Sequence, residues 1–427
     1  MDYKITGYKP EKLFHFFEEI SAIPRGSGNE KEISDYLVKF AKDRNLWVYQ
    51  DEAHNVIIKK DGSEGAKDKD PVMLQGHIDM VCDKLAGVEH DFEKDGIDLV
   101  VKDGVLSANG TTLGADNGVA VALMMMVLDD DEIKHPPVEC VFTTEEEVGL
   151  NGAQVLDKSL ITARTMINMD SEEEGVATIS CAGGLRIQFT RPVKREAAEG
   201  SLVSIKIKGL LGGHSGMDIS KERQNANLLM ARVVDHLMKN TDGKLVNFAG
   251  GTKDNAITRE CEASLIYADK AEADKAEKLA CALAEVLGDE ITPDEPDFAC
   301  EISAEEGRTA SALPADDAKA SHSAIRLAPN GVFSRNMKMD GFVVTSSNMG
   351  VVKADEDCLL IVVSPRSSVA SLQENTKGRF QTLADAFGFE AEYSGEYPGW
   401  SFAEKSRVRE VFVESYRELF GKELKLE

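Results

Sequence analysis

The stretch Gln75-Gly76-His77-Ile78-Asp79-Met80 places a histidine and a carboxylate two positions apart, directly after the apolar run Val72-Met73-Leu74. Side chains at positions i and i+2 of a β-strand point to the same face of the sheet. One imidazole and one carboxylate can therefore meet at a single point where this strand ends. Taken alone, the pair is better explained by a hydrogen-bonded structural histidine and aspartate at a strand end than by a pair of ligands.

Further acidic clusters also follow apolar runs, and together they favour a metal site. They contain Asp116 (in 113–118), Glu145 to Glu147 (in 141–149) and Asp170 (in 166–172). Strand ends of an open α/β sheet are where ligands gather. Carboxylate oxygens with one imidazole suit a divalent transition metal, zinc first, with manganese or cobalt as alternatives. Crowding so many carboxylates without a cation would be electrostatically costly.

Each cluster also has a simpler explanation when it is considered by itself. Asp116 could cap the apolar helix expected over Val119 to Leu128, and Glu145 to Glu147 could be a solvated run of charge. The metal interpretation therefore depends on the clusters meeting in space.

The elements that would position these residues follow an α/β pattern up to about Asp170. Two amphipathic helices within 10–44 are separated by a Gly/Pro break at 23–28, and strands, helices and acidic loops then alternate. The run from Arg164 to Asp170 is expected to be the last buried strand of this unit. The order of expected elements changes in the later segments. Strands are expected near 202–208, 341–345 and 359–363, and helices near 224–239 and 271–287. They predict an α+β domain inserted into the first, before a final helix at 408–420.

Composition excludes several classes of protein. The 427 residues carry 49 Lys and Arg against 75 Asp and Glu, a formal charge of −26, and no basic stripe. We therefore expect neither nucleic acid nor an anionic membrane surface as a partner. No signal peptide and no apolar run of membrane-spanning length is present, and the seven scattered cysteines fit a reducing compartment, so a cytoplasmic location is expected.

Together the motifs resemble the di-zinc metallopeptidases related to carboxypeptidase G and aminoacylase. Within that group the chain is most similar to the aminoacyl-histidine dipeptidases, also called Xaa-His or beta-alanyl-histidine dipeptidases. The likeness runs in order along nearly the whole chain. Besides the acidic clusters, it rests on Gly212-Gly213-His214-Ser215-Gly216, Gln224-Asn225-Ala226-Asn227, Gly251-Thr252-Lys253-Asp254-Asn255-Ala256-Ile257, Pro329-Asn330-Gly331-Val332 and Thr345-Ser346-Ser347-Asn348-Met349-Gly350.

The resemblance assigns the metal ligands. It implies that His77 and Asp170 bind the first of two metal ions, that Asp116 bridges both, and that Glu147 binds the second. It also implies a cis peptide bond after Asp116, as in relatives. The expected fold is a zinc-peptidase-like α/β catalytic domain with an inserted α+β lid domain.

The resemblance also assigns the residues that act without binding metal. The family pattern E-E-x-G ends here at Gly149, which makes Glu146 the general base. Asp79 would hydrogen-bond His77 and fix its tautomer. His214 is similar to the histidine that stabilises the oxyanion, and Asn255 and Arg366 to residues that hold the substrate amide and its C-terminal carboxylate. By themselves, His214 also fits a turn histidine and Arg366 a surface ion pair.

The expected domains are residues 1–183 and 398–427 for the catalytic domain, and 184–397 for the lid, which could also form a homodimer. In relatives a C-terminal histidine completes the second metal site. The eight histidines here are 15, 54, 77, 90, 135, 214, 236 and 322. The second catalytic segment is therefore expected to be truncated, or the chain to be a degenerate relative.

The leading functional hypothesis is a cytosolic metallopeptidase that hydrolyses Xaa-His dipeptides with metal-activated water and Glu146 as base. One alternative is a tripeptidase, carboxypeptidase or N-acyl amino acid deacylase of the same group. Another is a catalytically impaired relative that binds peptides without turning them over.

Overall fold

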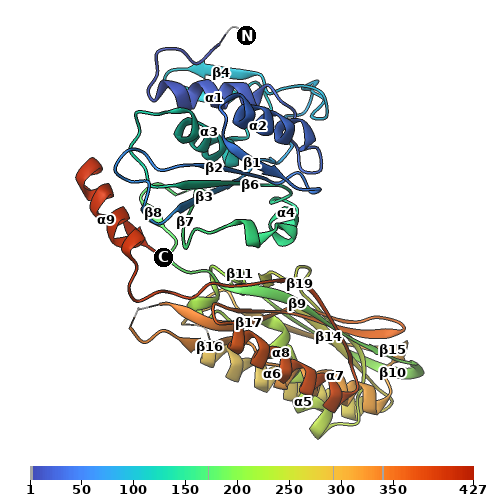
Figure 1. Cartoon of the computed structure of the whole chain (residues 1–427). Helices are drawn as coiled ribbons and strands as arrows, with labels where there is room; N and C mark the ends of the chain where they lie inside the picture. Colours follow the sequence, from blue (N-terminus) through green and yellow to red (C-terminus); the bar gives the residue numbers. More distant parts are fainter. Residues whose placement is uncertain (1–2, 172, 292, 339–340) are drawn as a thin grey trace. The chain divides into compact units, whose positions relative to one another are not determined.

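The computed structural model describes residues 3–171, 173–291, 293–338 and 341–427. The chain divides into two compact units, which are described separately (Figure 1). Unit 1 contains Met1–Thr178 and Ser406–Glu427, and unit 2 contains Ile179–Lys405. Unit 2 is thus inserted between two segments of unit 1.

Unit 1 is built around a five-stranded sheet in the order β1-β2-β6-β3-β7. The strands of this sheet are β1 Trp47–Gln50, β2 Val56–Lys60, β6 Val138–Thr143, β3 Val72–His77 and β7 Thr165–Asn168. Unit 1 also has two separate strand pairs, β4 Leu99–Lys102 with β5 Val105–Ala108, and β8 Val176–Ala177 with β20 Lys425–Leu426. Its helices are α1 Glu11–Ser21, α2 Lys31–Asp43, α3 Ala115–Asp129, α4 Asn151–Val155 and α9 Arg407–Phe420, with the 3-10 turn η1 Lys158–Leu160. β3 pairs in parallel with both β6 and β7, so the carboxyl ends of these strands lie at one edge of the sheet.

Helix α3 is the most buried helix of unit 1. Its sequence from Val119 to Leu128 is apolar on nearly every side, so it can be stable only between other elements. It packs against α1 and β3, while α2 packs against β1 and β2. These helices cover one face of the sheet, and α4 lies on the other (Figure 1). The start of α3 is thereby fixed beside the end of β3.

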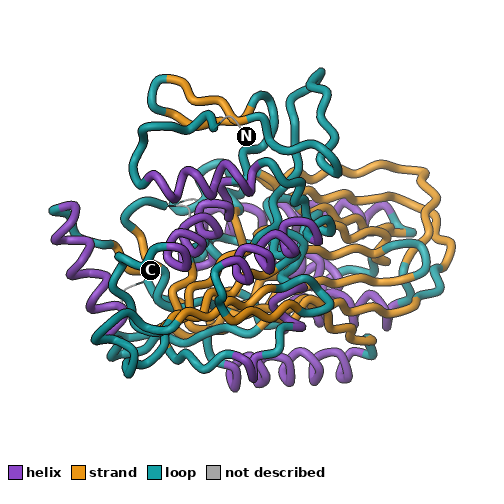
Figure 2. Tube along the Cα trace, turned by 45° about the horizontal axis from the view of Figure 1, so that its top comes forward, coloured by secondary structure: helices purple, strands orange, loops and turns teal. Residues whose placement is uncertain are grey.

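Unit 2 has a nine-stranded antiparallel sheet in the order β15-β10-β14-β12-β17-β18-β9-β19, with β16 also paired to β17. Figure 2 shows these strands in orange. The strands are β9 Gly183–Pro192, β10 Glu196–Lys208, β11 Gly213–His214, β12 Lys244–Gly250, β13 Ala256–Ile257, β14 Cys261–Tyr267, β15 Ala299–Ala312, β16 Gly331–Arg335, β17 Val343–Ala354, β18 Cys358–Ser367 and β19 Glu390–Tyr397. The helices are α5 Ala226–Asn240, α6 Lys270–Ile291, α7 Ala315–Leu327 and α8 Ala370–Phe387, with the 3-10 turn η2 Ile219–Lys221. These four helices lie along one face of the sheet and bury its core (Figure 1).

The predicted fold class, an α/β domain with an inserted α+β domain, is confirmed. The domain boundaries expected after residues 183 and 397 stay predictions; the compact units of the structure divide after Thr178 and after Lys405. In the part of the chain that the structure describes, every helix is too short or too polar to cross a membrane.

One expectation about the elements is wrong. The run at 164–170 forms the strand β7, but β7 is not buried. It lies at the edge of the sheet, its residues alternate between half-buried and exposed, and the side chain of Met166 is 50% exposed. A short apolar run looks the same in a central strand and in an edge strand, because the difference lies in its neighbours.

Candidate metal centre

Four loops at one edge of the sheet of unit 1 bring the predicted ligands together. His77 ends β3, Asp116 lies at the start of α3, Glu146 and Glu147 follow β6, and Asp170 follows β7. Because β6, β3 and β7 are parallel neighbours, the loops that leave them emerge side by side. The sequence clusters thus meet in space.

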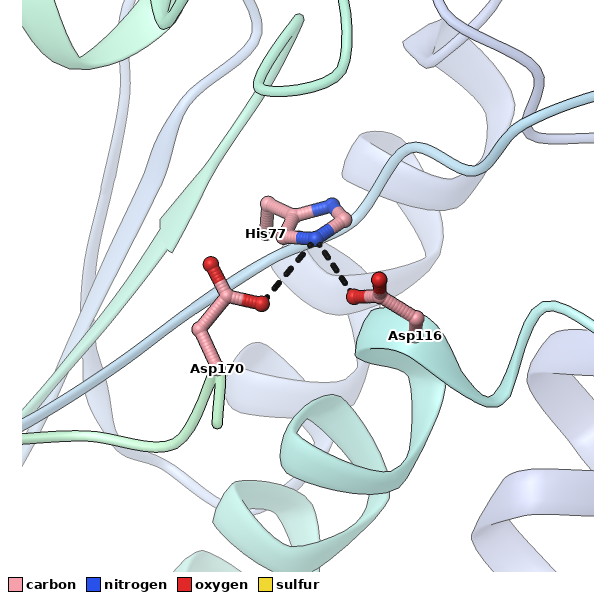
Figure 3. Close-up of side chains that lie close together, drawn as sticks. All are labelled: His77, Asp116 and Asp170. Atoms are coloured by element: carbon pink, nitrogen blue, oxygen red, sulfur yellow. Dashed lines mark hydrogen bonds and ion pairs between the residues drawn. The ribbon is translucent and has the colours of Figure 1, made fainter. Parts of the chain in front are cut away.

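The carboxylates converge on one nitrogen of His77. Nε2 of His77 lies 3.0 Å from Oδ1 of Asp116, 3.5 Å from Oδ1 of Asp170 and 4.0 Å from Oε2 of Glu146 (Figure 3 for the first two). The imidazole is buried, whereas the carboxylates are partly exposed. One potential ligand atom from each of His77, Asp116 and Asp170 lies within 4.8 Å of the others, and the same holds for His77, Glu146 and Glu147.

The charges of this cluster fit a cation. Burial lowers the pKa of His77, but its contacts with Asp170 and Asp79 outweigh burial and raise it to about 11. Burial raises the pKa of Glu146 and of Glu147, and neighbouring carboxylates raise both further. The negative charge of the carboxylates around this imidazole also attracts a divalent cation, and the nitrogen and oxygen donors are those that zinc accepts.

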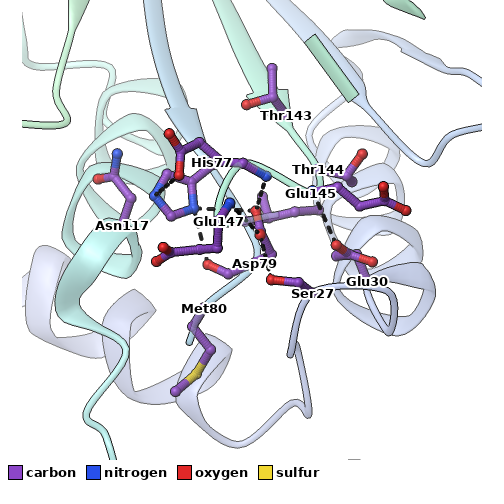
Figure 4. Close-up of polar contacts among 12 residues, drawn as sticks. Ser27, Glu30, His77, Asp79, Met80, Asn117, Thr143, Thr144, Glu145 and Glu147 are labelled. Atoms are coloured by element: carbon purple, nitrogen blue, oxygen red, sulfur yellow. Dashed lines mark hydrogen bonds and ion pairs between the residues drawn. The ribbon is translucent and has the colours of Figure 1, made fainter. Parts of the chain in front are cut away.

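Asp79 supports His77 from the side opposite to these carboxylates. Nδ1 of His77 faces the carbonyl oxygen of Asp79 at 3.1 Å and Oδ1 of Asp79 at 3.2 Å. Both are acceptors, so Nδ1 carries a hydrogen and Nε2 is the atom available to a metal. The Asp79 carboxylate also accepts the backbone N–H of Glu146 at 3.1 Å and that of Glu147 at 3.3 Å (Figure 4 for Glu147). Burial raises its pKa, but the hydrogen bonds outweigh burial and hold it below the usual range.

The three consecutive glutamates do not play the same part. The backbone of Glu145 has a positive φ of 50°, and its carboxylate accepts a hydrogen bond from Nδ2 of Asn151 at 2.8 Å. Glu146 and Glu147 instead belong to the group around His77. The backbone of this loop therefore directs the carboxylate of Glu145 to Asn151, whereas the carboxylates of Glu146 and Glu147 lie near His77.

The start of α3 has an unusual backbone. The peptide bond between Asp116 and Asn117 is cis, as the resemblance implied, and neither residue has helical dihedral angles. The side-chain amide of Asn117 donates to Oδ1 of Asp170 at 3.0 Å. Asn117 is thus a further contact of the cluster, which sequence reasoning did not identify.

Unit 2 carries the other three candidate residues. His214 lies in β11, which pairs with β13, and its Nδ1 accepts the backbone N–H groups of Gly216 and Met217, both at 3.2 Å. An added Cβ at Gly216 would lie 3.2 Å from Cε1 of His214 and 3.6 Å from Cζ of Arg366, so these two side chains flank this glycine.

Asn255 and Arg366 have further contacts within unit 2. The carbonyl oxygen of Asn255 accepts the N–H of Ser215, next to His214, at 2.8 Å. The guanidinium of Arg366 donates to the hydroxyl of Tyr397 at 2.7 Å, and its Nε has no hydrogen-bond partner among the described residues. Tyr397 is a second residue that sequence reasoning did not identify.

Sequence reasoning also missed the residues under the metal centre. Arg25, Ser27 and Glu30 contact the loops that carry the ligands, whereas the sequence pattern indicates only a break between two helices at 23–28, followed by the second helix. The sequence does not indicate this role, because an arginine in such a break is ordinarily exposed and its burial is seen only in the structure.

Comparisons with known proteins find relatives along nearly the whole chain. The model of peptidase family M20/M25/M40 matches residues 73–427. The chain is 35% identical over 425 residues to the cytosol non-specific dipeptidase of Escherichia coli K12. The matched residues make up 98% of this chain and 86% of that relative. The crystal structure of aminoacylhistidine dipeptidase from Vibrio alginolyticus matches with a TM-score of 0.93 and 34% identity, over 99% of this chain and 86% of that one.

Proposed function

The chain belongs to peptidase family M20/M25/M40, and we propose that it is a metal-dependent dipeptidase with its active centre around His77. The observation that carries this proposal is the convergence of Asp116, Asp170 and Glu146 on Nε2 of one buried imidazole. The names of the relatives from Escherichia coli and Vibrio alginolyticus support a dipeptide as the substrate, and the first also supports a cytosolic location.

We assign the ligands as the resemblance does. His77, Asp170, Asp116 and Glu147 would together hold two divalent ions, with zinc as the proposed species. Such ions would polarise the peptide carbonyl and lower the pKa of the attacking water. The donor set supports this assignment, because one imidazole and several carboxylates are ligands that zinc commonly has.

Glu146 is the proposed general base. Its raised pKa suits a group that accepts a proton near neutral pH, and the N–H contact with Asp79 fixes its backbone. Glu146 takes one proton from water as the new C–O bond forms. It returns that proton to the amine nitrogen as the C–N bond breaks, so the products are two amino acids. Asp79 keeps both His77 and Glu146 in position.

We propose that unit 2 supplies the groups that hold the substrate, within the lid expected over 184–397. His214 would stabilise the negative oxygen that develops during attack, and Asn255 would bind the substrate amide. Arg366 would bind the C-terminal carboxylate, because a guanidinium pairs with a carboxylate through two parallel hydrogen bonds. Dipeptides with a C-terminal histidine are one proposed substrate, and a homodimer through this domain is the proposed assembly.

A panel of substrates tests the proposal. Purified protein with and without added zinc is offered free dipeptides, including β-Ala-His, together with tripeptides and N-acyl amino acids. We expect zinc-dependent hydrolysis of dipeptides, with kcat lower by at least about 100-fold in Glu146→Gln. Faster cleavage of tripeptides or N-acyl amino acids would identify one of the other activities of the group. Zinc and peptide binding without any turnover would identify the impaired binding relative.

A further inference from the structure

Arg25 ties together two loops that carry metal ligands in unit 1. It is 2% exposed, and its Nη1 donates to the carbonyl oxygens of Ile78 at 3.1 Å and Asp79 at 3.2 Å, directly after His77. Its Nη2 donates to the carbonyl oxygen of Gly114, two residues before Asp116. One guanidinium therefore spans the end of β3 and the start of α3.

The surrounding chain leaves room for this guanidinium. A Cβ at Gly114 would lie 2.5 Å from Nη2 of Arg25, and a Cβ at Gly118 would lie 2.7 Å from the same atom. The backbone N–H of Met80 also donates to the carbonyl oxygen of Arg25 at 3.1 Å. Larger residues at either glycine would displace the arginine.

The same segment also contacts the loop that carries Glu145, Glu146 and Glu147. Ser27 donates to Oδ2 of Asp79 at 2.8 Å, and Oε1 of Glu30 accepts the backbone N–H of Glu145 at 3.1 Å. Figure 4 shows Ser27 beside Asp79 and Glu30 beside Glu145. Residues 25–30 therefore contact all three loops: the one that carries His77, the one that carries Asp116, and the one that carries Glu146 and Glu147.

The positive charge of Arg25 does not explain why the residue lies beside the proposed metal ligands. Burial lowers its pKa to about 10, against the opposing effect of Asp79, so the group stays protonated at neutral pH. A fixed positive charge near a cation site repels the cation. If charge were its whole effect, removing Arg25 would tighten metal binding. Its geometry has the opposite consequence, because it fixes the spacing of the loops.

We propose that Arg25 is a positioning residue of the metal centre, whose planar fork holds the His77 loop and the Asp116 loop at ligand distance before metal binds. This inference rests on the proposed metal centre. A lysine cannot replace the arginine, since a single ammonium point cannot reach carbonyl oxygens on both loops in the same way.

The test compares the zinc affinity of Arg25→Met and Arg25→Lys with that of the unaltered protein, by competition with a chelating dye. We expect both substitutions to weaken zinc binding by about 10- to 100-fold, the usual effect of residues that orient metal ligands. The zinc concentration that half-restores hydrolysis should rise in parallel, with KM for the dipeptide unchanged.

Arg195→Lys is the matched control. Arg195 donates to the carbonyl oxygens of Asp355 at 2.9 Å, Val246 at 2.7 Å, Ser311 at 2.8 Å and Ala354 at 2.6 Å, all in unit 2. It is thus another arginine that joins backbone segments, but in the unit that holds no proposed metal ligand. Its substitution should lower the melting temperature without changing zinc affinity.

Gly118→Ala gives a second test that keeps Arg25 in the chain. Alanine favours a helix more than glycine does, but its methyl group would displace the guanidinium. We expect a folded protein with weakened zinc binding, even if Arg25→Met fails to fold.

Zinc binding by the Arg25 variants as tight as in the unaltered protein, or tighter, would overturn the proposal for Arg25 and leave the metal centre intact. Weakening by Arg25→Met but not by Arg25→Lys would also overturn it, because a single ammonium donor would then suffice and the fork of the guanidinium would not be needed. Absence of zinc binding by the unaltered protein would remove the metal centre and this inference together.

Discussion

Oδ1 of Asp79 lies 3.2 Å from Nδ1 of His77, on the side of the imidazole that faces away from the other carboxylates. The same carboxylate accepts the backbone N–H groups of Glu146 and Glu147. One buried side chain therefore orients a proposed ligand and the loop that carries both the proposed base and a second ligand. This linkage predicts that a change at Asp79 alters metal binding and catalysis together.

Asp79→Asn should weaken zinc binding by about 10- to 100-fold and lower kcat as well. The substituted amide has one nitrogen that cannot accept hydrogen bonds, so it cannot satisfy all the donors that now face Asp79. Asp157→Asn is the control, because Asp157 also accepts a backbone N–H, from Ser159 at 3.0 Å, but is exposed. Zinc titration and steady-state kinetics measure both effects. Loss of zinc affinity without any loss in kcat at saturating zinc would contradict the linkage.

Glu146→Gln and Glu147→Gln should have different effects. The first should keep zinc affinity and lower kcat by at least about 100-fold, since a proposed general base is lost. The second should weaken zinc binding, since a proposed ligand is lost. Calorimetry and kinetics on the two variants separate the roles, and the reversed pattern would mean that the assignments are exchanged.

Arg366→Met should raise KM for free dipeptides by about 10- to 100-fold, because it removes a charged donor to the substrate carboxylate. Tyr397→Phe removes the hydroxyl that accepts from Arg366, so a smaller rise in KM is expected. Substrates with an amidated C-terminus are the internal control. If Arg366→Met impaired these amides as strongly as free dipeptides, the arginine would not be the carboxylate site.

The stability of unit 2 should depend on pH through His322. This buried histidine donates from Nδ1 to the carbonyl oxygen of Ala318 at 2.8 Å, while its Nε2 lies 3.4 Å from Asp235, which also contacts Arg326 and Lys239. Burial lowers its pKa below the ordinary 6.5. The unfolded chain therefore binds the proton more readily, and stability is lost as pH falls below about 6.5.

His322→Gln cannot gain this charge, so its stability should fall less between about pH 7.5 and about pH 5.5 than that of the unaltered protein. Urea denaturation at the two pH values measures the difference, and all other titrating groups are common to both proteins. Parallel losses of stability in the two proteins would exclude His322 as the cause.

The arrangement of the metal centre follows largely from rules that can be applied to sequence. His77 and Asp79 lie at the end of a strand, and parallel strands bring their ends to one edge, so Glu146 and Asp170 arrive beside them. The roles within this cluster came from resemblance and not from spacing, and they stay predictions until they are tested.

Other features could not be predicted, because they depend on contacts between distant parts of the chain. Arg25 donates to a carbonyl 53 positions away and to another 89 positions away, and no local periodicity indicates such contacts. The approach of His214 to Arg366 likewise depends on how β11 and β18 are arranged in unit 2. The exposure of β7 depends on its place at the edge of the sheet.

The most direct test of the central claim is dipeptide hydrolysis by metal-depleted protein as zinc is added back. We expect no hydrolysis after chelation, and recovery of hydrolysis in proportion to the zinc bound at the His77 cluster. In His77→Asn, both zinc binding and recovery should be weakened, because Nε2 is removed from the centre of the carboxylates. Hydrolysis that persists after metal removal, or zinc binding that His77→Asn leaves unchanged, would exclude a metal-dependent active centre around His77.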